Sequence, residues 1–315
     1  MDTRAGARKG VAILLNPSAG RGKALKSKNR LAALFRARGI PHDLLVTESE
    51  AQLRELAREK ARECEILAAA GGDSTFQIVA EEILKAGARA RLAMFGLGSS
   101  NDIPREFGLD SLEKTVSALE EGRSRRIDLG SVESDGAACG FFIGQASIGL
   151  GVFVNQAAVR VASRTPGLAR FQTAVGVWGV ALALRKRLVP VPLFVESEVG
   201  KIEGRFQVAN FANIRFWATG RVLVPRARPD DGRLDACLIR EGSFLRLARL
   251  ALSAKKGRHL RAAGVELLQS PAFDISSERP FAVQVDGEVI GGASSPRLFR
   301  EIRVSVVPGA LTIVA

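Results

Sequence analysis

The sequence predicts a two-domain protein, in which an α/β domain with a parallel sheet precedes a mostly antiparallel β-sandwich. Up to residue 130, short apolar segments alternate with amphipathic helical segments, which is typical of a parallel sheet covered by helices on both faces. After residue 130, most apolar segments are short and are separated by turn sequences, which is typical of antiparallel sheets. We therefore place the first domain at residues 1–130 and the second at residues 131–315.

The first domain should contain four strands that alternate with helices. The strands are predicted at residues 11–15, 42–46, 65–70 and 91–95, and the helices at residues 24–38, 51–63, 75–85 and 112–121. Ligands of such sheets bind where loops leave the carboxyl ends of the strands. The loops that follow these strands are therefore the first places to look for function.

The second domain should consist mainly of strands, which are predicted at residues 127–132, 140–145, 189–196, 205–214, 234–240, 282–285 and 302–307. Two helical segments interrupt them, near residues 151–188 and 243–257. The first includes the apolar stretch 171–184, which is too short to span a bilayer and is followed by three basic residues. This stretch is expected either to line a lipid entrance or to be a core helix.

Composition narrows the function classes. Lys and Arg total 46 against 33 acidic residues, so that the net charge is +13. This surplus suits a nucleotide, an anionic membrane or a nucleic acid, and it also serves solubility alone. With 6% aromatic residues and no recognisable motif, nucleic-acid binding is not expected. We expect a cytoplasmic protein that can lie peripherally on a membrane.

Cysteine and histidine exclude further classes. The three cysteines are scattered and indicate neither a disulfide framework nor a zinc site. The two histidines, His42 and His259, are expected at the surface. A hydrolase with a Ser-His-Asp triad is therefore poorly supported.

Three glycine-rich polar loops follow predicted strands of the first domain. Residues 15–23 read LNPSAGRGK, residues 68–75 read AAAGGDST, and residues 96–102 read GLGSSND. The first lacks the Walker A pattern, and the third lacks the GxGxxG dinucleotide pattern. Glycine lets the backbone approach a phosphate, and a helix N-terminus favours its negative charge. Because the carboxyl ends of parallel strands share one edge of the sheet, these loops predict a nucleotide site there.

Two acidic turns mark the second domain. Residues 230–232 (DDG) can bind a divalent cation through oxygen ligands or form an ordinary turn. Residues 286–288 (DGE) follow a predicted strand, and Asp-Gly is a common hairpin signal. Taken alone, each of these segments is explained at least as well by an ordinary turn as by a functional site.

Taken together and in order, the motifs resemble the diacylglycerol kinase catalytic domain family, which includes bacterial and eukaryotic lipid kinases and sphingosine kinases. The resemblance covers nearly the whole chain, and it rests on residues 16–20 (NPSAG), 71–73 (GGD), 98–102 (GSSND), 126–128 (RID), 213 (N), 225–227 (PRA), 230–232 (DDG) and 286–288 (DGE). The family combines an α/β nucleotide domain with a β-sandwich, which matches the fold predicted above. The resemblance implies that the β-sandwich contributes the catalytic acids and the lipid-binding cleft.

By this resemblance the protein is a kinase that uses ATP and Mg²⁺ to phosphorylate a lipid hydroxyl, diacylglycerol-like or sphingoid. The residues that the resemblance assigns to ATP are Asn16, Pro17, Ser18, Ala19, Gly20, Thr47, Gly71, Gly72, Asp73, Ser74, Thr75, Phe76, Gln77, Ser99 and Asn101. Asp73, Asn101 and Asp128 would organise the phosphates and the catalytic magnesium. Asp231 would hold a structural magnesium, with the backbone carbonyls of Arg228 and Arg233. The general base would come from the pair Asp286 and Glu288, because a carboxylate must accept the hydroxyl proton.

One departure from the family pattern keeps alternatives open. Ser74 stands where the family has glycine, and a serine there is strained if its φ is positive. The alternatives are a catalytically degenerate regulator that binds nucleotide or lipid, and a kinase of a soluble substrate related to NAD kinases. The expected partner is a lipid at an anionic membrane surface, and a homodimer is compatible with the sequence.

Overall fold

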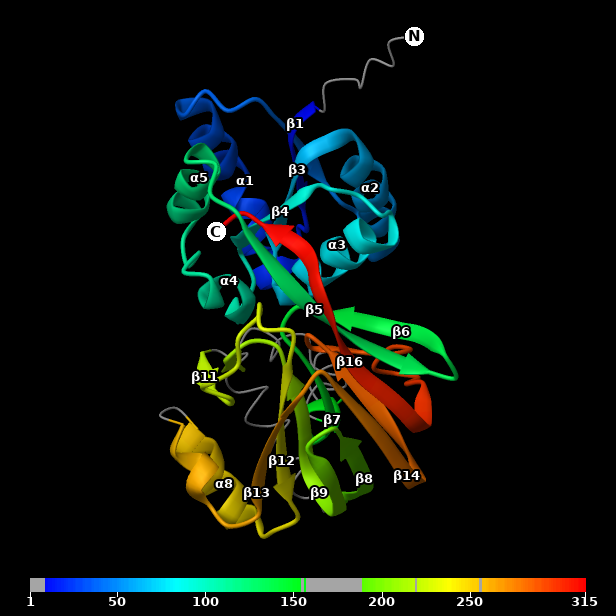
Figure 1. Ribbon diagram of the computed structural model, residues 1–315. Coiled ribbons are helices and arrows are strands. Elements are labelled where there is room, and N and C mark those ends of the chain that lie inside the picture. Colours follow the sequence, from blue (N-terminus) through cyan, green and yellow to red (C-terminus); the bar gives the residue numbers. More distant parts are fainter. Residues whose placement is uncertain (1–8, 154–155, 157–188, 219, 255–256) are drawn as a thin grey trace. The chain divides into compact units, whose positions relative to one another are not determined.

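The computed structural model describes residues 9–153, 156, 189–218, 220–254 and 257–315. The chain divides into two compact units, of which the first comprises Met1–Ile127 with Gly309–Ala315 and the second Asp128–Pro308 (Figure 1). The apolar stretch 171–184, and almost all of the helical segment predicted near residues 151–188, lie outside the described residues. Among the residues that are described, no helix is long and apolar enough to cross a membrane.

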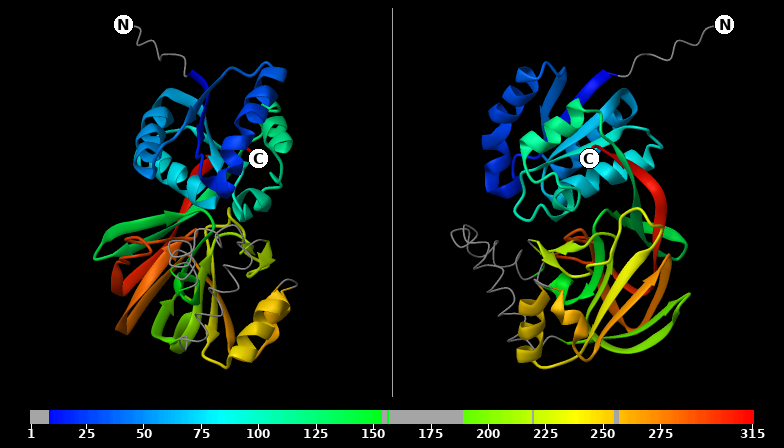
Figure 2. Two further views of the ribbon diagram at one scale, coloured as in Figure 1. Left: turned by 180° about the vertical axis from the view of Figure 1, so that it is seen from behind. Right: turned by 60° about the vertical axis from the view of Figure 1, so that its left-hand side comes forward.

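Four parallel strands form the centre of the first unit. They are β1 (Lys9–Leu15), β2 (His42–Val46), β3 (Cys64–Gly71) and β4 (Arg91–Gly96). β1 lies between β2 and β3, and β4 lies on the other side of β3. Apolar residues of these strands, among them Ile13, Leu67 and Met94, are fully buried, because helices cover both faces of the sheet (Figure 1 and Figure 2).

The helices of the first unit are α1 (Ala19–Ala37), α2 (Glu50–Glu63), α3 (Asp73–Lys85), α4 (Asp102–Glu106) and α5 (Leu112–Glu120). Figure 1 shows α1 and α5 on one side of the sheet and α2 and α3 on the other. In α2, the Ser49 hydroxyl caps the N-terminus by accepting a hydrogen bond from the Gln52 N–H. Leu53 and Ala57, one turn apart, are buried.

The C-terminus of the chain returns to the first unit. β16 (Leu298–Ile313) ends beside β4, where Ile313 is in register with Leu92 and the Val314 N–H donates to the Leu92 carbonyl oxygen (2.9 Å). This corrects the predicted second domain of residues 131–315, because Gly309–Ala315 belong to the first unit. The strand fills an otherwise unpaired edge of β4, and a hydrophobic pattern does not specify which strand fills an edge.

The second unit is built mainly from antiparallel strands. They are β5 (Arg125–Ser134), β6 (Ala137–Phe142), β7 (Gln145–Gly149), β8 (Val191–Ser197), β9 (Gly200–Ala212), β10 (Phe216–Trp217), β11 (Arg221–Val222), β12 (Leu234–Arg240), β13 (Val265–Ser270), β14 (Ala272–Val285), β15 (Glu288–Val289) and the first part of β16. The strand predicted at residues 140–145 is split by a turn between β6 and β7. The helical segment predicted near residues 243–257 contains α8 (Phe244–Ser253) and is followed by the short helix η3 (Arg258–Arg261).

Strands β7 and β8 occupy one position in the sheet, end to end. On β9, β7 pairs with residues 208–212 and β8 with residues 200–206. On β14, β7 pairs with residues 283–285 and β8 with residues 273–276. The chain therefore leaves this strand position after Gly149 and returns to it at Val191.

The core of the second unit imposes its own requirements on the sequence. Gly130 of β5 lies opposite the buried Phe142 of β6, and a Cβ at residue 130 would enter the Phe142 ring. This glycine is therefore required by close packing.

The prediction that both histidines lie at the surface is wrong for His259, which is buried with its Nε2 2.9 Å from the Leu223 carbonyl oxygen. A backbone partner lets a neutral imidazole be buried.

Candidate functional site

Three loops of the first unit meet at the carboxyl ends of β1, β3 and β4. We call them loop 1 (residues 16–22), loop 2 (residues 71–75) and loop 3 (residues 96–101). The Leu97 N–H in loop 3 donates to the Gly71 carbonyl oxygen in loop 2 (2.7 Å). A Cβ on Gly98 would lie only 2.5 Å from the Gly72 Cα, and a Cβ on Gly20 would collide with the Leu97 carbonyl oxygen. The loops approach this closely because glycines stand at the contacts.

Loop 2 includes the first turn of α3, which begins at Asp73. The first N–H groups of a helix have no partners within the helix, and they carry partial positive charge. A phosphate placed against loop 2 would therefore meet both free donors and a favourable dipole.

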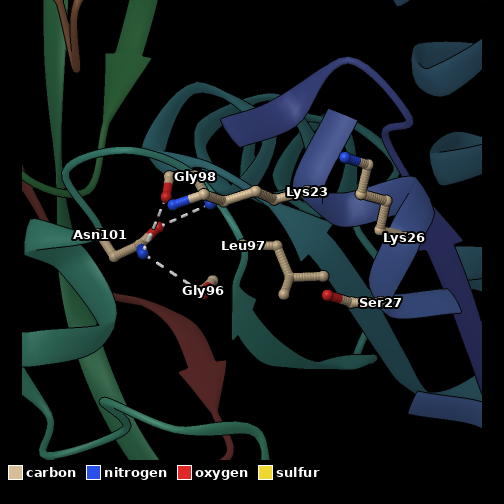
Figure 3. A pocket seen from close by; sticks show the side chains of 7 residues that line it. All are labelled: Lys23, Lys26, Ser27, Gly96, Leu97, Gly98 and Asn101. Carbon is tan, nitrogen blue, oxygen red and sulfur yellow. Dashed lines mark hydrogen bonds between the residues drawn. The ribbon is translucent and has the colours of Figure 1, made fainter. Parts of the chain in front are cut away.

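A pocket of about 320 Å³ lies where loop 3 faces the beginning of α1 (Figure 3). Lys23, Lys26 and Ser27 line it from α1, and Gly96, Leu97, Gly98 and Asn101 line it from loop 3. Figure 3 shows Lys23 extending toward Gly98. The sequence argument missed Lys23, Lys26 and Ser27 as site residues. Their spacing of three and four residues just after a glycine-rich loop was the signal, because it places all three on one side of a helix.

Two predicted ATP residues of the first unit tie strand ends and loops together. The Asn16 Oδ1 accepts hydrogen bonds from the N–H and the hydroxyl of Ser18 (3.1 and 2.8 Å), and the Asn16 Nδ2 donates to the Thr75 Oγ1 (3.2 Å). The N–H and the hydroxyl of Thr47 donate to the Leu15 carbonyl oxygen (2.9 and 3.3 Å). Pro17 and Ala19 are half-buried beside these groups. These contacts maintain the shape of the loops.

Asn101 holds loop 3 in a left-handed turn, with a φ of 53°. Its Oδ1 accepts from the Gly98 N–H (2.9 Å), and its Nδ2 donates to the carbonyl oxygens of Gly96 and Gly98 (3.3 and 3.2 Å; Figure 3). Asparagine tolerates this backbone conformation better than most residues. Ser99, at the tip of the same loop, is exposed.

Phe76 and Gln77, which the resemblance assigns to ATP, have buried side chains. The Phe76 side chain is fully buried, and Gln77 is 4% exposed and donates to the Glu81 Oε2 (3.0 Å). Both lie within α3, where the helical period turns these positions toward the core of the unit. Their side chains are therefore not available to a nucleotide.

Ser74 is the second residue of α3 and does not have a positive φ. The strain expected if this position required a left-handed backbone is therefore absent. The departure from glycine adds a short polar side chain at the first turn of the helix, where serine is well tolerated.

Asp73 connects loop 2 to α4. Its carboxylate accepts hydrogen bonds from the N–H groups of Asp102 (3.2 Å) and Ile103 (3.1 Å). Burial, with a smaller contribution from the Asp102 carboxylate, raises the pKa of Asp73 to about 6. A cation or a bound phosphate–cation pair would favour the ionised form, so this carboxyl group is poised to respond to a ligand.

The second unit gathers its acidic residues around Asn213. The buried Nδ2 of Asn213 donates to the carbonyl oxygens of Asp128 and Ile143 (both 2.9 Å), and its N–H donates to the Gly144 carbonyl oxygen (2.8 Å). The Asp128 carboxylate accepts from the Gly232 N–H (2.8 Å). One side chain therefore ties Asp128, and through it the DDG turn, to the turn between β6 and β7.

The DDG turn lies close to a third carboxylate, that of Asp128. Burial raises the pKa of Asp231, and the nearby carboxylates of Asp128 and Asp230 raise it further. The guanidinium group of Arg233 pairs instead with Glu198 (2.6 Å), and that of Arg228 lies 3.6 Å from Asp230. Oxygen donors that repel one another suit a hard divalent cation, so the residues present fit the magnesium that the resemblance implies. In the part of the chain that the structure describes, no three or more His, Cys, Asp or Glu side chains form a metal-binding group.

Asp286 is held by the backbone of the turn between β6 and β7. Its Oδ1 accepts from the N–H groups of Gly144 (2.9 Å) and Gln145 (2.8 Å), and its Oδ2 accepts from that of Ile143 (2.7 Å). Asp286 itself has a φ of 45°. Three backbone donors stabilise an ionised carboxylate, so Asp286 shapes this turn whatever else it does. Glu288, two residues later on β15, is exposed.

A row of buried polar side chains crosses the sheet beside this turn. Asn210 on β9, Ser147 on β7 and Gln284 on β14 are in register with one another. Gln284 donates to the Ser147 hydroxyl (2.9 Å), and Asn210 donates to the Gln145 Oε1 (2.7 Å). The Asn210 Oδ1 and the Gln284 Oε1 are buried and accept no hydrogen bond from the described residues. Sequence reasoning missed this row, because it appears only when three distant strands are aligned.

Loops that bind phosphate and carboxylates that can accept a hydroxyl proton are what phosphoryl transfer to an alcohol requires. The protein is accordingly an ATP-dependent phosphotransferase with an alcohol group as acceptor. The diacylglycerol kinase catalytic domain matches residues 10–132, and the YegS C-terminal NAD kinase beta sandwich-like domain matches residues 144–315. The chain belongs to the lipid kinase family that joins these two domains.

Individual relatives agree with this assignment and with the predicted two-domain architecture. A diacylglycerol kinase of Mycobacterium tuberculosis is 28% identical over 291 residues, which cover 89% of this chain and 91% of the relative. A diacylglycerol kinase of Staphylococcus saprophyticus is 24% identical and covers 90% of both chains. The crystal structure of a diacylglycerol kinase from Bacillus anthracis shares the fold, with a TM-score of 0.68 and 14% identity over 98% of this chain and 96% of its own.

Proposed function

We propose that this protein is a lipid kinase that uses ATP and Mg²⁺ to transfer the γ-phosphoryl group to a lipid hydroxyl, on a diacylglycerol-like or sphingoid acceptor. The observation that carries the proposal is the meeting of the three loops at the N-terminus of α3, next to the pocket lined by Lys23 and Lys26. A nucleotide triphosphate is the ligand that this combination of glycine backbone, helix N-terminus and two cations suits best.

The residues of the first unit would bind and orient the donor. Loop 2 would receive the phosphates, and Lys23 would neutralise part of their charge. Asp73 would hold the catalytic magnesium, and Asp231 with neighbouring oxygens would hold the structural one. Magnesium, when bound, supplies charge neutralisation of the γ-phosphoryl group.

The second unit would supply the proton acceptor and contacts to the lipid headgroup. Asp286 and Glu288 are the carboxylates from which the acceptor is drawn. The buried amide oxygens of Asn210 and Gln284 are suited to accept hydrogen bonds from hydroxyl groups. A headgroup that retains a hydroxyl after reaction, such as that of a sphingoid base, would satisfy such an oxygen.

The first experiment measures transfer from γ-³²P-labelled ATP by purified protein with Mg²⁺. The panel contains diacylglycerol, a sphingoid base, ceramide, undecaprenol and phosphatidylglycerol. We expect one labelled lipid, which is lost in Asp73→Ala and retained in Asp43→Ala, a matched control because Asp43 is exposed on β2. ATP binding without any labelled lipid would favour a degenerate regulator, and label in a soluble acceptor would favour an NAD-kinase-like enzyme.

The acid limb of kcat/KM for ATP is expected near pH 6, where Asp73 takes up its proton. Because a cation requires the ionised carboxylate, kcat/KM should fall about tenfold per pH unit below the limb. The pKa of Asp73 in the folded protein lies above the ordinary value of 3.8, so protonation of Asp73 also stabilises the folded first unit. This contribution to stability is lost as the pH rises through about 6. An Asp102→Asn variant removes the neighbouring negative charge and should move the limb to lower pH. A pH–rate profile that stays flat through pH 6 would contradict the role of Asp73.

A further inference from the structure

We propose that an exposed face of the second unit docks on an anionic lipid bilayer. This face consists of Leu245 and Arg249 on α8, Arg258 and Arg261 on η3, and Leu267 on β13; we call it the α8 face. The inference goes beyond the proposed reaction, because it concerns the surface on which the protein binds. It is tested without measuring phosphoryl transfer.

Apolar side chains are exposed on this face although α8 has already buried an apolar side. Leu247 and Leu250 of α8 pack in a core cluster with Cys237 and Ile239 of β12. Leu245 points away from that cluster and is 63% exposed. The helix therefore presents a second, outward apolar position, which core packing does not explain.

Leu267 adds to the same face. It is in register with Cys237 on β12, and paired residues of neighbouring strands point to the same side of a sheet. Because Cys237 faces the cluster beneath α8, Leu267 also lies on the side of the sheet that α8 covers. It is 45% exposed. Single exposed leucines are ordinary, so the case depends on what surrounds these two.

Three arginines lie on α8 and on η3, and η3 contacts both α8 and β13. Arg249, Arg258 and Arg261 are exposed, and none of them forms an ion pair with any residue that the structure describes. The nearby acids are already engaged: Glu241 pairs with Arg205, and Glu266 pairs with Arg240. The α8 face therefore combines free positive charge with exposed leucine. This pairing is typical of helices that lie at the surface of anionic membranes.

A groove beside α8 gives a headgroup a place to bind. Its volume is about 400 Å³, and it is lined by Arg246, Arg249, Leu250, Ser253 and Ala262. The guanidinium group of Arg246 is already used, since it donates to the carbonyl oxygens of Arg240 (3.1 Å), Glu241 (3.0 Å) and Ala263 (2.5 Å). The Ser253 hydroxyl donates to the Leu250 carbonyl oxygen (2.9 Å), which leaves Arg249 to meet a lipid phosphate.

The face is held in place before any membrane is present. The Ser243 hydroxyl caps α8 by accepting from the Arg246 N–H (3.3 Å). The buried His259 joins η3 to Leu223. A preformed surface binds without paying to order its own backbone. Leucine and arginine side by side favour a bilayer over a nucleic acid, which would use the arginines but not the leucines.

The test is co-sedimentation of the full chain with vesicles of phosphatidylcholine alone or mixed with phosphatidylglycerol. We expect binding to the mixed vesicles that weakens with salt. Changing Arg249, Arg258 and Arg261 together to Glu should weaken this binding by at least about a hundredfold. Leu245→Ser should weaken it severalfold at every salt concentration.

Matched controls distinguish an effect of this face on vesicle binding from an effect of the total charge or of unfolding. Changing Arg36, Arg62 and Arg89 together to Glu alters the net charge equally at exposed positions of the first unit, and Leu298→Ser removes an exposed leucine outside the α8 face. Both controls should bind vesicles as the unchanged protein does. Because all the altered side chains are exposed, every variant should remain folded, and thermal unfolding should change only slightly, through the charges placed in the last turns of α1 and α2.

The proposal would be overturned if the control variants lost vesicle binding equally, or if the α8-face variants lost none. Equal binding to vesicles of phosphatidylcholine alone would also overturn it. So would binding to duplex DNA that depends on the three arginines and not on Leu245. Transfer to lipid dispersed in detergent reports separately on the proposed reaction. Loss of vesicle binding with that transfer retained supports the docking face. Vesicle binding without any transfer overturns the proposed function and leaves the docking face intact.

Discussion

An Asp286→Asn variant is expected to lose phosphoryl transfer and also to destabilise the second unit by about 3 kcal/mol, because its carboxylate accepts hydrogen bonds from three backbone N–H groups. An asparagine keeps one acceptor oxygen and turns an NH₂ group toward the remaining donors. The turn at residues 143–145 would then carry unsatisfied buried donors. Urea unfolding followed by circular dichroism, together with labelled-ATP transfer, measures both effects.

Glu288→Gln is the matched variant, because Glu288 is exposed at the start of β15, just after the turn that contains Asp286. Its stability should change by less than about 0.5 kcal/mol. A fall in transfer of about 10²–10⁴ in this variant would identify Glu288 as the proton acceptor. Full transfer would leave that role to Asp286. Unchanged stability in Asp286→Asn would contradict the structural part of the argument.

A Gly98→Ala variant should reduce kcat/KM for ATP about a hundredfold, since displacements of about 1 Å in a reactive site have effects of this size. The added Cβ would lie 2.5 Å from the Gly72 Cα and 2.9 Å from the Asn101 Oδ1. Neither neighbour can yield without moving backbone, because Gly72 precedes α3 and Asn101 holds loop 3. Loops 2 and 3 would therefore separate, and the phosphates would lose their alignment.

The control for this variant is Gly140→Ala on β6, where an added Cβ would make ordinary contacts of 3.5 Å or more with Val285 and Ile290. It should keep its kcat/KM for ATP. Steady-state kinetics at varied ATP concentration compare the two variants, and thermal unfolding confirms that both are folded. A Gly98→Ala enzyme with unchanged kcat/KM would show that loops 2 and 3 need not touch during the reaction.

Local signals in the sequence were sufficient to find the three loops. Each combines an apolar strand, a glycine and a helix start within a few residues, and turn chemistry of this kind depends on neighbours in the chain. The side of α3 that faces the core was harder to predict. Phe76 and Gln77 directly follow the GGDST motif, but their positions on the helix place them on its buried side. A sequence motif alone does not show which side of a helix each residue faces.

By itself, the sequence determined the division into α/β and β segments, the glycine-rich loops and the acidic turns, because periodicity and turn preference are local properties. Tertiary structure alone decided that β16 returns to pair with β4, that Asp286 is held by a turn more than a hundred residues earlier in the chain, and that Asn210, Ser147 and Gln284 form one row. It also decided that Leu245 and Leu267 remain exposed and that Arg249, Arg258 and Arg261 form no ion pair with the residues that the structure describes. Contacts of this kind depend on which distant strands become neighbours, and many pairings are compatible with the same alternation of apolar and polar residues.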